Sequence, residues 1–131
     1  MGANDRIQLG HVGAGGRGRY VLQNFTKVPT VEVRAICDVW SNQIDEARRI
    51  APNAKGYRDY RKMLEGEKLD AVLVTTPDHW HVPIAIEALE SGRHVYVEKP
   101  LTLTMDQGPL VVKAARVNNR ICLSARMLLL N

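Results

Sequence analysis

The feature that most constrains this 131-residue chain is a glycine-rich segment between an apolar run and a stretch with helical periodicity. Its glycines match the pattern G-x-G-x-x-G, with one additional glycine inside it: Gly13, Gly15, Gly16 and Gly18. The apolar run predicts a strand at residues 6–12. Apolar side chains follow the glycines at helical spacing: Val21, Phe25 and Val28. Because glycine tolerates close contacts, the segment either turns the chain or admits a ligand to the backbone.

Further apolar segments predict strands, with helix-like stretches between them: 31–38, 54–57 (the weakest), 69–75, 93–98 and 121–125. Residues 71–74 are apolar on consecutive positions rather than on alternate ones. A strand covered on both faces has this pattern, which favours a parallel sheet between two helix layers. Right-handed crossovers then predict an α/β fold with a doubly wound, parallel six-stranded sheet of the Rossmann type, in the order 3-2-1-4-5-6.

Helix boundaries are predicted from capping residues. Ser41 is the predicted N-cap of the second helix, and Ser91-Gly92 is predicted to end a later one. Residues 104–107 match a capping box that opens the last helix, which Asn118-Asn119 would end. His11 is unexpected, because a branched apolar side chain is typical of the innermost strand. It either forms a hydrogen bond there or destabilises the sheet.

The glycine segment has the features of a dinucleotide-binding loop. In this interpretation Gly13 makes the tight turn, Gly15 lets the backbone approach a pyrophosphate, and Gly18 lets the helix pack closely on the sheet. The pyrophosphate would lie on the unpaired N–H groups at the helix N-terminus, where the helix dipole favours an anion. Gly16 belongs to the same loop, and Arg17 can add a cationic contact. A purely structural turn is the alternative.

Asp38 ends the second predicted strand, 20 residues after Gly18. A carboxylate at this position accepts hydrogen bonds from the adenosine ribose and repels a 2′-phosphate. Residues 39–43 contain no arginine or lysine that would accommodate such a phosphate. The predicted cofactor is therefore NAD, with NADP less favoured. Trp40 either flanks the adenine or is an ordinary surface residue.

A second motif, TTPDHWHVPIAIEALESGRHVYVEKPLTLT, occupies residues 75–104. Together with the glycine loop and Cys37-Asp38, it resembles the Gfo/Idh/MocA family, which includes glucose–fructose oxidoreductase and inositol dehydrogenases. The tripeptide Glu98-Lys99-Pro100, which closes a predicted strand, is the most specific part of the resemblance. The resemblance covers nearly the whole chain. It implies the N-terminal NAD(P)-binding Rossmann domain of an oxidoreductase that acts mainly on sugars and related polyols.

The resemblance also implies roles for individual residues. Thr76, Pro77 and His81 would line the nicotinamide ribose side of the cofactor, and Glu98 would lie near the nicotinamide. Lys99 would be catalytic, because its ammonium group can position a substrate hydroxyl and help to transfer its proton. Glu98 would keep that ammonium charged.

Other classes of function have less support in the sequence. The net charge of +4 is scattered along the chain, which does not predict nucleic-acid binding, and no apolar run reaches the length of a membrane span. His79 and His81 lack a third ligand at a suitable spacing, so helix capping is favoured and no metal is predicted. Cys37 and Cys122 match no disulfide or metal framework, which favours buried thiols and a cytoplasmic location.

The predicted Rossmann domain covers residues 1–125, and an apolar tail follows at 126–131. In the family a second domain supplies most of the substrate pocket, and we expect this chain to lack it. Catalysis by the chain alone would then be incomplete, because the substrate must be held in register with the nicotinamide. The tail and last strands are expected either in a homodimer or higher homo-oligomer contact, or folded over their own sheet edge.

Three functions remain open at this point. The chain is a stand-alone NAD(H)-binding domain of an oxidoreductase, a dehydrogenase completed by oligomerisation, or a non-catalytic module that senses NAD(H). A methyltransferase would share the glycine loop and Asp38, but it does not account for Glu98-Lys99-Pro100. Nucleotide hydrolysis is poorly supported, because no G-K-[ST] follows the glycines.

Overall fold

The computed structural model describes residues 6–76, 80–98 and 107–124 of the chain. Six strands form one sheet in the order β3-β2-β1-β4-β5-β6, and all neighbouring strands are parallel. The strands are β1 Ile7–Val12, β2 Val31–Cys37, β3 Lys55–Tyr57, β4 Ala71–Val74, β5 His94–Val97 and β6 Cys122–Ser124. This arrangement confirms the predicted doubly wound α/β sheet and its strand order.

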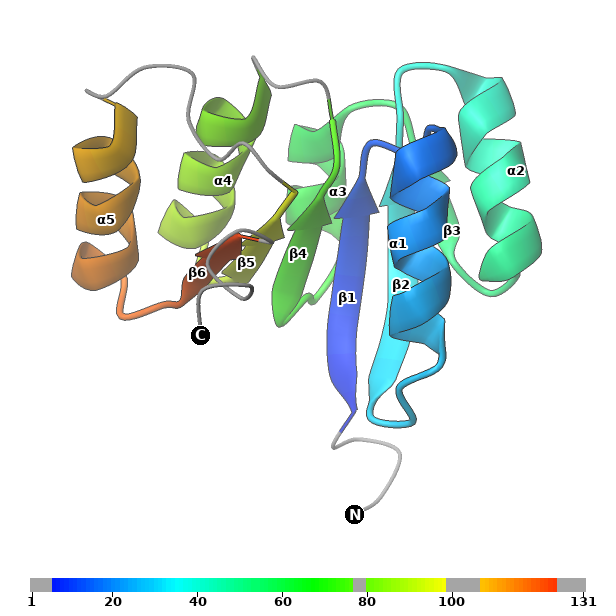
Figure 1. Ribbon diagram of the computed structural model, residues 1–131, viewed down its shortest axis with the longest axis horizontal. Helices are drawn as coiled ribbons and strands as arrows, with labels where there is room; N and C mark the ends of the chain where they lie inside the picture. The colour runs from blue at the N-terminus through cyan, green and yellow to red at the C-terminus, as the bar shows by residue number, and fades with distance from the viewer. Residues whose placement is uncertain (1–5, 77–79, 99–106, 125–131) are drawn as a thin grey trace.

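Five helices connect these strands in the described part of the chain: α1 Gly16–Thr26, α2 Ser41–Ile50, α3 Tyr60–Gly66, α4 His81–Glu90 and α5 Gln107–Val117. Helices α1 and α2 pack on one face of the sheet, and α3, α4 and α5 pack on the other (Figure 1). Each helix layer has its own cluster of buried apolar side chains against the sheet. The loops that follow the strands gather at the carboxyl ends of the strands, at one edge of the sheet.

Strand β4 shows why a consecutive apolar run predicted a buried parallel strand. Val72 and Val74 belong to the core under α3, α4 and α5, whereas Leu73 belongs to the core under α1 and α2. All three side chains are at most 1% exposed. Both faces of the strand therefore require apolar residues, since a polar side chain there would be buried without a partner.

Two local features differ from the sequence prediction. Ser41 is the first helical residue of α2, and Trp40, in an extended conformation, occupies the N-cap without a side-chain cap. The predicted Ser41 cap is wrong because Asp38 already accepts a hydrogen bond from the Trp40 N–H, at 2.9 Å, and turns the chain one residue earlier. Helix α3 was not predicted, because its seven residues are too few to show helical periodicity. Asp59 caps it by accepting from the Arg61 N–H at 2.9 Å.

The other helix ends agree with the sequence prediction wherever the structure describes them. Ser91 is the C-cap of α4, and Gly92 follows it with a φ of 90°. Asn119 has a φ of 52° and lies just beyond the end of α5. Of the predicted capping box at 104–107, only Gln107 is described, and it is the first residue of α5. The left-handed residues confirm the predicted ends of both helices.

Two glycines of the loop are required by close contacts with the backbone. Gly13 has a φ of +94°, and a Cβ there would lie 2.6 Å from main-chain atoms of Thr75 and Thr76. At Gly18 a Cβ would lie 2.1 Å from the Gly13 carbonyl oxygen. These distances confirm the tight turn at Gly13 and the close packing of α1 at Gly18.

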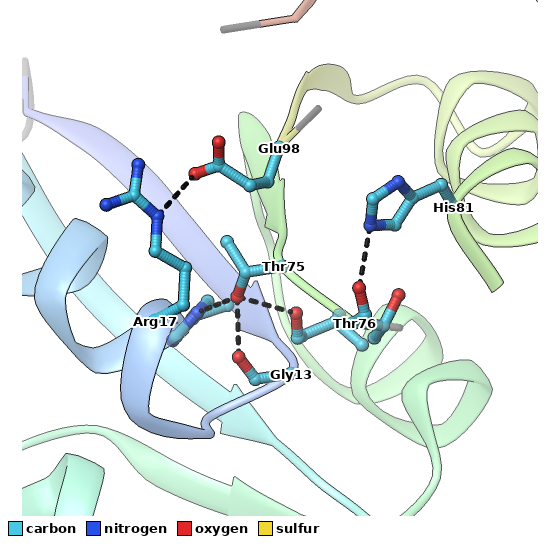
Figure 2. Close-up of polar contacts among 8 residues, drawn as sticks. Gly13, Arg17, Thr75, Thr76, His81 and Glu98 are labelled. Carbon is cyan, nitrogen blue, oxygen red and sulfur yellow. Dashed lines mark hydrogen bonds and ion pairs between the residues drawn. The ribbon is translucent and has the colours of Figure 1, made fainter. Parts of the chain in front are cut away.

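His11 is fully buried in β1 and forms a hydrogen bond there. Its Nε2 lies 2.8 Å from the Thr75 Oγ1, which lies 2.5 Å from the Gly13 carbonyl oxygen. A hydroxyl carries one proton, so Thr75 donates to Gly13 and accepts from the Nε2–H of a neutral imidazole. Burial lowers the pKa of His11 to about 3, which keeps the ring neutral near pH 7. Figure 2 shows how Thr75 thereby ties the glycine loop to the end of β4.

We expect Gly18→Ala to destabilise the fold, because the new methyl group would overlap a backbone oxygen of the glycine loop. Overpacking costs about 1–3 kcal/mol, and a rigid backbone neighbour places this variant at the upper end. Gly16→Ala is the matched control, since a Cβ there meets nothing within 4 Å. Urea denaturation gives the free energy of unfolding of both variants. Equal stability of the two would show that the contact at Gly18 is not tight.

The buried His11 predicts a pH dependence of stability. Its folded pKa of about 3 lies below the ordinary value of 6.5, so the unfolded chain takes up a proton that the folded chain excludes. This contribution is fully present above the ordinary pKa and falls as the pH drops toward the folded pKa, by up to about 1.4 kcal/mol per pH unit. Urea denaturation between about pH 6 and pH 4 should show a shallower slope for His11→Val than for the unchanged chain. If the unfolding free energy of both proteins changed equally with pH, His11 would not have the lowered pKa that its burial predicts.

Candidate functional site

A cleft of about 520 Å³ lies at the carboxyl ends of the strands, beside the glycine loop. Every predicted site residue in the described part of the chain lines it: Gly13, Gly15, Gly16, Arg17, Gly18, Asp38, Thr76, His81 and Glu98. The other two, Pro77 and Lys99, lie outside the described residues. The cleft is located where the strand order reverses, between β1 and β4, which is where open α/β sheets bind ligands.

The N-terminus of α1 opens into this cleft. The first N–H groups of a helix have no partner inside the helix, and α1 has neither a side-chain cap at Gly15 nor an acidic residue in its first turn. A Cβ at Gly15 or Gly16 would meet nothing within 4 Å, so open space adjoins these residues. Arg19 is engaged elsewhere, because its Nη1 donates to the Ala14 carbonyl at 2.9 Å. An anion can therefore approach the first amides of the helix.

The Asp38 carboxylate is held between the glycine loop and α2. Its Oδ2 accepts a hydrogen bond from the Ala14 N–H at 2.8 Å, and its Oδ1 accepts from the Trp40 N–H at 2.9 Å. These bonds fix the carboxylate at the end of β2, and an ionised carboxylate has lone pairs for two further donors. Asp38 can therefore accept hydrogen bonds from a diol in the cleft while keeping its position.

Arg17 and Glu98 form an ion pair across the cleft. The Arg17 Nε lies 3.4 Å from the Glu98 Oε2, and Figure 2 shows the two side chains pointing toward each other from α1 and from the end of β5. Glu98 is buried, with 8% of its surface exposed, whereas the Arg17 side chain is 63% exposed. The Arg17 guanidinium also lies over the Tyr20 ring, 5.2 Å from its centroid. A positive and a negative group thus face the same cleft beside the helix N-terminus.

His81 fixes the segment that follows β4. It is buried, and its Nε2 donates to the Thr76 carbonyl oxygen at 2.7 Å (Figure 2). Because His81 is the first residue of α4, this bond connects the start of the helix to the end of the strand. The Thr76 Oγ1 is buried and has no hydrogen-bond partner among the described residues. A buried hydroxyl of this kind favours a polar ligand group beside it.

A second hollow, of about 350 Å³, shares Gly13, Asp38 and Thr76 with the cleft. Its lining includes apolar, aromatic and cationic side chains: Val39, Arg58, Tyr60, Arg61, Trp80 and Ile84. Mostly apolar recesses with a few polar groups are typical of small-molecule sites. The pKa of Tyr60 is raised to about 12, mainly by burial, so its hydroxyl stays protonated.

Sequence reasoning gave no role to most residues of this second hollow. Arg58 and Tyr60 follow β3, the weakest of the predicted strands, and α3 itself was not predicted. The signal that could have found them is the strand order, because it places β3 beside β2 and brings Arg58 level with Asp38. The ion pair of Arg17 with Glu98 was also missed, since it depends on how two side chains far apart in the sequence are directed.

Other reactive groups have ordinary structural explanations. No group of three His, Cys, Asp or Glu side chains in the described segments could hold a metal ion, and His79 lies outside these segments. Cys37 and Cys122 are free thiols, and burial is the main cause that raises their pKa values to about 12 and about 11. Both therefore stay protonated near pH 7. None of the described helices has the length and apolarity that crossing a membrane requires.

Comparison with known proteins agrees with this geometry. Residues 7–125 match the family model GFO_IDH_MocA, described as an oxidoreductase family with an NAD-binding Rossmann fold. A glycosyl hydrolase family 109 protein from Shewanella putrefaciens is 34% identical over 128 residues, which cover 91% of this chain and 28% of that protein. The chain thus spans less than a third of the length of this relative.

Solved structures share the fold. An NAD-binding protein from Listeria innocua has a TM-score of 0.84 and 33% identity, covering 92% of this chain and 35% of that one. The WlbA dehydrogenase from Bordetella pertussis, solved with NADH and UDP-GlcNAcA, has a TM-score of 0.85 and 26% identity, covering 95% and 40%. Because the family model matches nearly all of the chain, this protein belongs to the Gfo/Idh/MocA oxidoreductase family and has its NAD-binding Rossmann fold.

Proposed function

We propose that the chain binds NAD(H) in the cleft at the carboxyl ends of the strands. The observation that carries this proposal is the uncapped N-terminus of α1, with open space at Gly15 and Gly16. The cofactor diphosphate would accept hydrogen bonds from these amides, with Arg17 as a nearby cation. The adenosine ribose would lie on Asp38, and the adenine would lie in the second hollow beside Trp80.

The preferred cofactor in this proposal is NAD rather than NADP. Asp38 is fixed by the N–H groups of Ala14 and Trp40, so it cannot easily turn away from the ribose. A fixed carboxylate accepts hydrogen bonds from the ribose hydroxyls and repels a phosphate on the same ribose.

The nicotinamide end of the proposed site comprises Thr76, Pro77, His81 and Glu98. When bound, NAD supplies the acceptor for a hydride. Lys99 is the proposed catalytic residue, whose ammonium would hydrogen-bond the substrate oxygen and support transfer of its proton. Glu98, which lies 3.4 Å from the Arg17 guanidinium, would provide the negative charge that keeps this ammonium protonated.

The proposed substrate is a sugar or a related polyol. Two relatives support this class: one is named a glycosyl hydrolase, and the other was solved with NADH and a nucleotide sugar. The chain spans 28% of the first and 40% of the second, so the complete activity is part of the proposal. A non-catalytic NAD(H) sensor would use the same cofactor residues and would oxidise no sugar.

We also propose that copies of the chain associate as a homodimer or higher oligomer through α5 and the edge strand β6. Apolar side chains are exposed on and beside these elements: Leu110, Val112, Val117 and Ile121. Association would cover this surface, and it is the arrangement that a dehydrogenase completed by oligomerisation would need. The free thiols Cys37 and Cys122 support a reducing, cytoplasmic location as part of the same proposal.

We expect Asp38→Ala to raise the Kd for NADH about tenfold, because charge-assisted hydrogen bonds to the ribose are lost. The Kd for NADPH should change less, because the variant loses the same hydrogen bonds but also loses the repulsion between the Asp38 carboxylate and the 2′-phosphate. Fluorescence titration with both nucleotides measures the two constants. Asp45→Ala, at an exposed position on α2, is the matched control and should bind like the unchanged chain. If Asp38→Ala kept the same preference for NADH over NADPH, the placement of the adenosine ribose on Asp38 would be refuted.

Light scattering after size-exclusion chromatography tests the proposed association. We expect a dimer or larger species, and we expect Val117→Glu to shift it toward the monomer by placing a charge at a residue that is 72% exposed. Arg116→Glu, at the neighbouring position on α5, is the control for a change of charge alone. A monodisperse monomer for the unchanged chain would contradict the proposal.

A further inference from the structure

His11 is a polar residue at the centre of the sheet, where the fold alone gives no reason for it. It lies between Ile36 of β2 and Leu73 of β4, and both of these apolar residues are fully buried. The His11 Nδ1 is buried and has no hydrogen-bond partner among the described residues. A buried polar atom without a partner destabilises a fold, and a strand covered on both faces needs only apolar side chains. A role for His11 must therefore come from its other ring nitrogen.

That nitrogen starts a continuous series of hydrogen bonds. The His11 Nε2–H donates to the Thr75 Oγ1 at 2.8 Å, and the Thr75 hydroxyl donates to the Gly13 carbonyl oxygen at 2.5 Å. The direction of the second bond is fixed, because two oxygens at this distance need a proton between them and a carbonyl has none to give. Figure 2 shows the Thr75 hydroxyl directed at Gly13.

The peptide unit between Gly13 and Ala14 continues the series to Asp38. The Gly13 carbonyl and the Ala14 N–H belong to one planar group, and this N–H donates to the Asp38 Oδ2 at 2.8 Å. Ala14 is fully buried, so water is not an alternative partner for its N–H. Rotation of the peptide would break the bonds on both of its sides. The position of the Asp38 carboxylate therefore depends on Thr75, and through Thr75 on His11.

We propose that His11 is a positioning residue for Asp38, which it reaches through the Thr75 hydroxyl and the glycine-loop peptide. This inference rests on the proposed cofactor site, in which Asp38 receives the adenosine ribose. In every bond of the series the donor lies on the His11 side, and bonds that run in one direction polarise one another. Without the imidazole, the Thr75 hydroxyl loses the donor that fixes it, and its proton can turn toward the Val12 carbonyl oxygen, 3.4 Å away.

Two substitutions at Thr75 separate this hydrogen bonding from packing. Thr75→Val keeps the shape of the side chain and removes the hydroxyl, whereas Thr75→Ser keeps the hydroxyl and removes the methyl group. The probes are 5′-AMP and 2′-deoxy-5′-AMP, which differ only in a hydroxyl that would donate to Asp38 in the proposed site.

NMR titration gives the Kd of both probes. We expect the unchanged chain and Thr75→Ser to prefer 5′-AMP about tenfold, and Thr75→Val and His11→Val to lose most of this preference. Thr26→Val, at the exposed far end of α1, is the matched control and should keep the preference.

The amide of Ala14 and the ring of His11 report on the same bonds without a ligand. We expect the Ala14 amide proton to move upfield in Thr75→Val and in His11→Val, because its bond to Asp38 lengthens, and to stay in place in Thr75→Ser. In the unchanged chain, the ring ¹⁵N shifts of His11 should place the proton on Nε2. A proton on Nδ1 would overturn the inference without any variant.

The remaining outcomes also overturn it. Equal weakening of both probes in Thr75→Val would mean that the hydroxyl supports the fold rather than Asp38. Loss of the preference in Thr75→Ser as well would mean that packing of the methyl group is what matters. If the unchanged chain bound neither 5′-AMP nor NADH, the proposed function itself would fail. The Ala14 signal would still show whether His11 positions Asp38, and an unmoved signal in His11→Val would show that it does not.

Discussion

The rest of the structure depends on the close approach of the glycine loop to the end of β4. No Cβ can be accommodated at Gly13 or Gly18, because backbone atoms would lie 2.6 Å and 2.1 Å away. The Thr75 hydroxyl bonds the Gly13 carbonyl oxygen from the same side, and the buried His11 fixes that hydroxyl. These contacts determine where α1 begins, and therefore where its unpaired amides meet the cleft.

The charges around the cleft match the parts of a dinucleotide. In the proposed site, the N-terminus of α1 would attract an anion at the centre, and the fixed Asp38 carboxylate would accept hydrogen bonds from a ribose diol at one end. At the other end, Glu98 is buried and paired with Arg17. Because each group comes from the carboxyl end of a different strand or from the helix that follows it, the parallel sheet itself brings them together.

The sequence was sufficient for the fold and for most of the cleft. Consecutive apolar residues in β4, the glycine pattern and Asp38 each reflect one local requirement, so they can be recognised without a structure. Arg58 could not be recognised from such a local pattern, since it lies 20 residues after Asp38 and is brought level with it only by the pairing of β3 with β2. Helix α3 is too short for a periodic signal, and the Ser41 prediction failed because Asp38 had already turned the chain.

The most direct test of a diphosphate on the first amides of α1 is a ¹H–¹⁵N NMR titration of the chain with NADH. We predict saturable shifts that are largest for the amides of Gly15, Gly16 and Arg17, with Asp38 also affected. Uptake of NADH that leaves the amide signals of this helix N-terminus unchanged would contradict the central claim, as would the absence of any uptake at millimolar NADH.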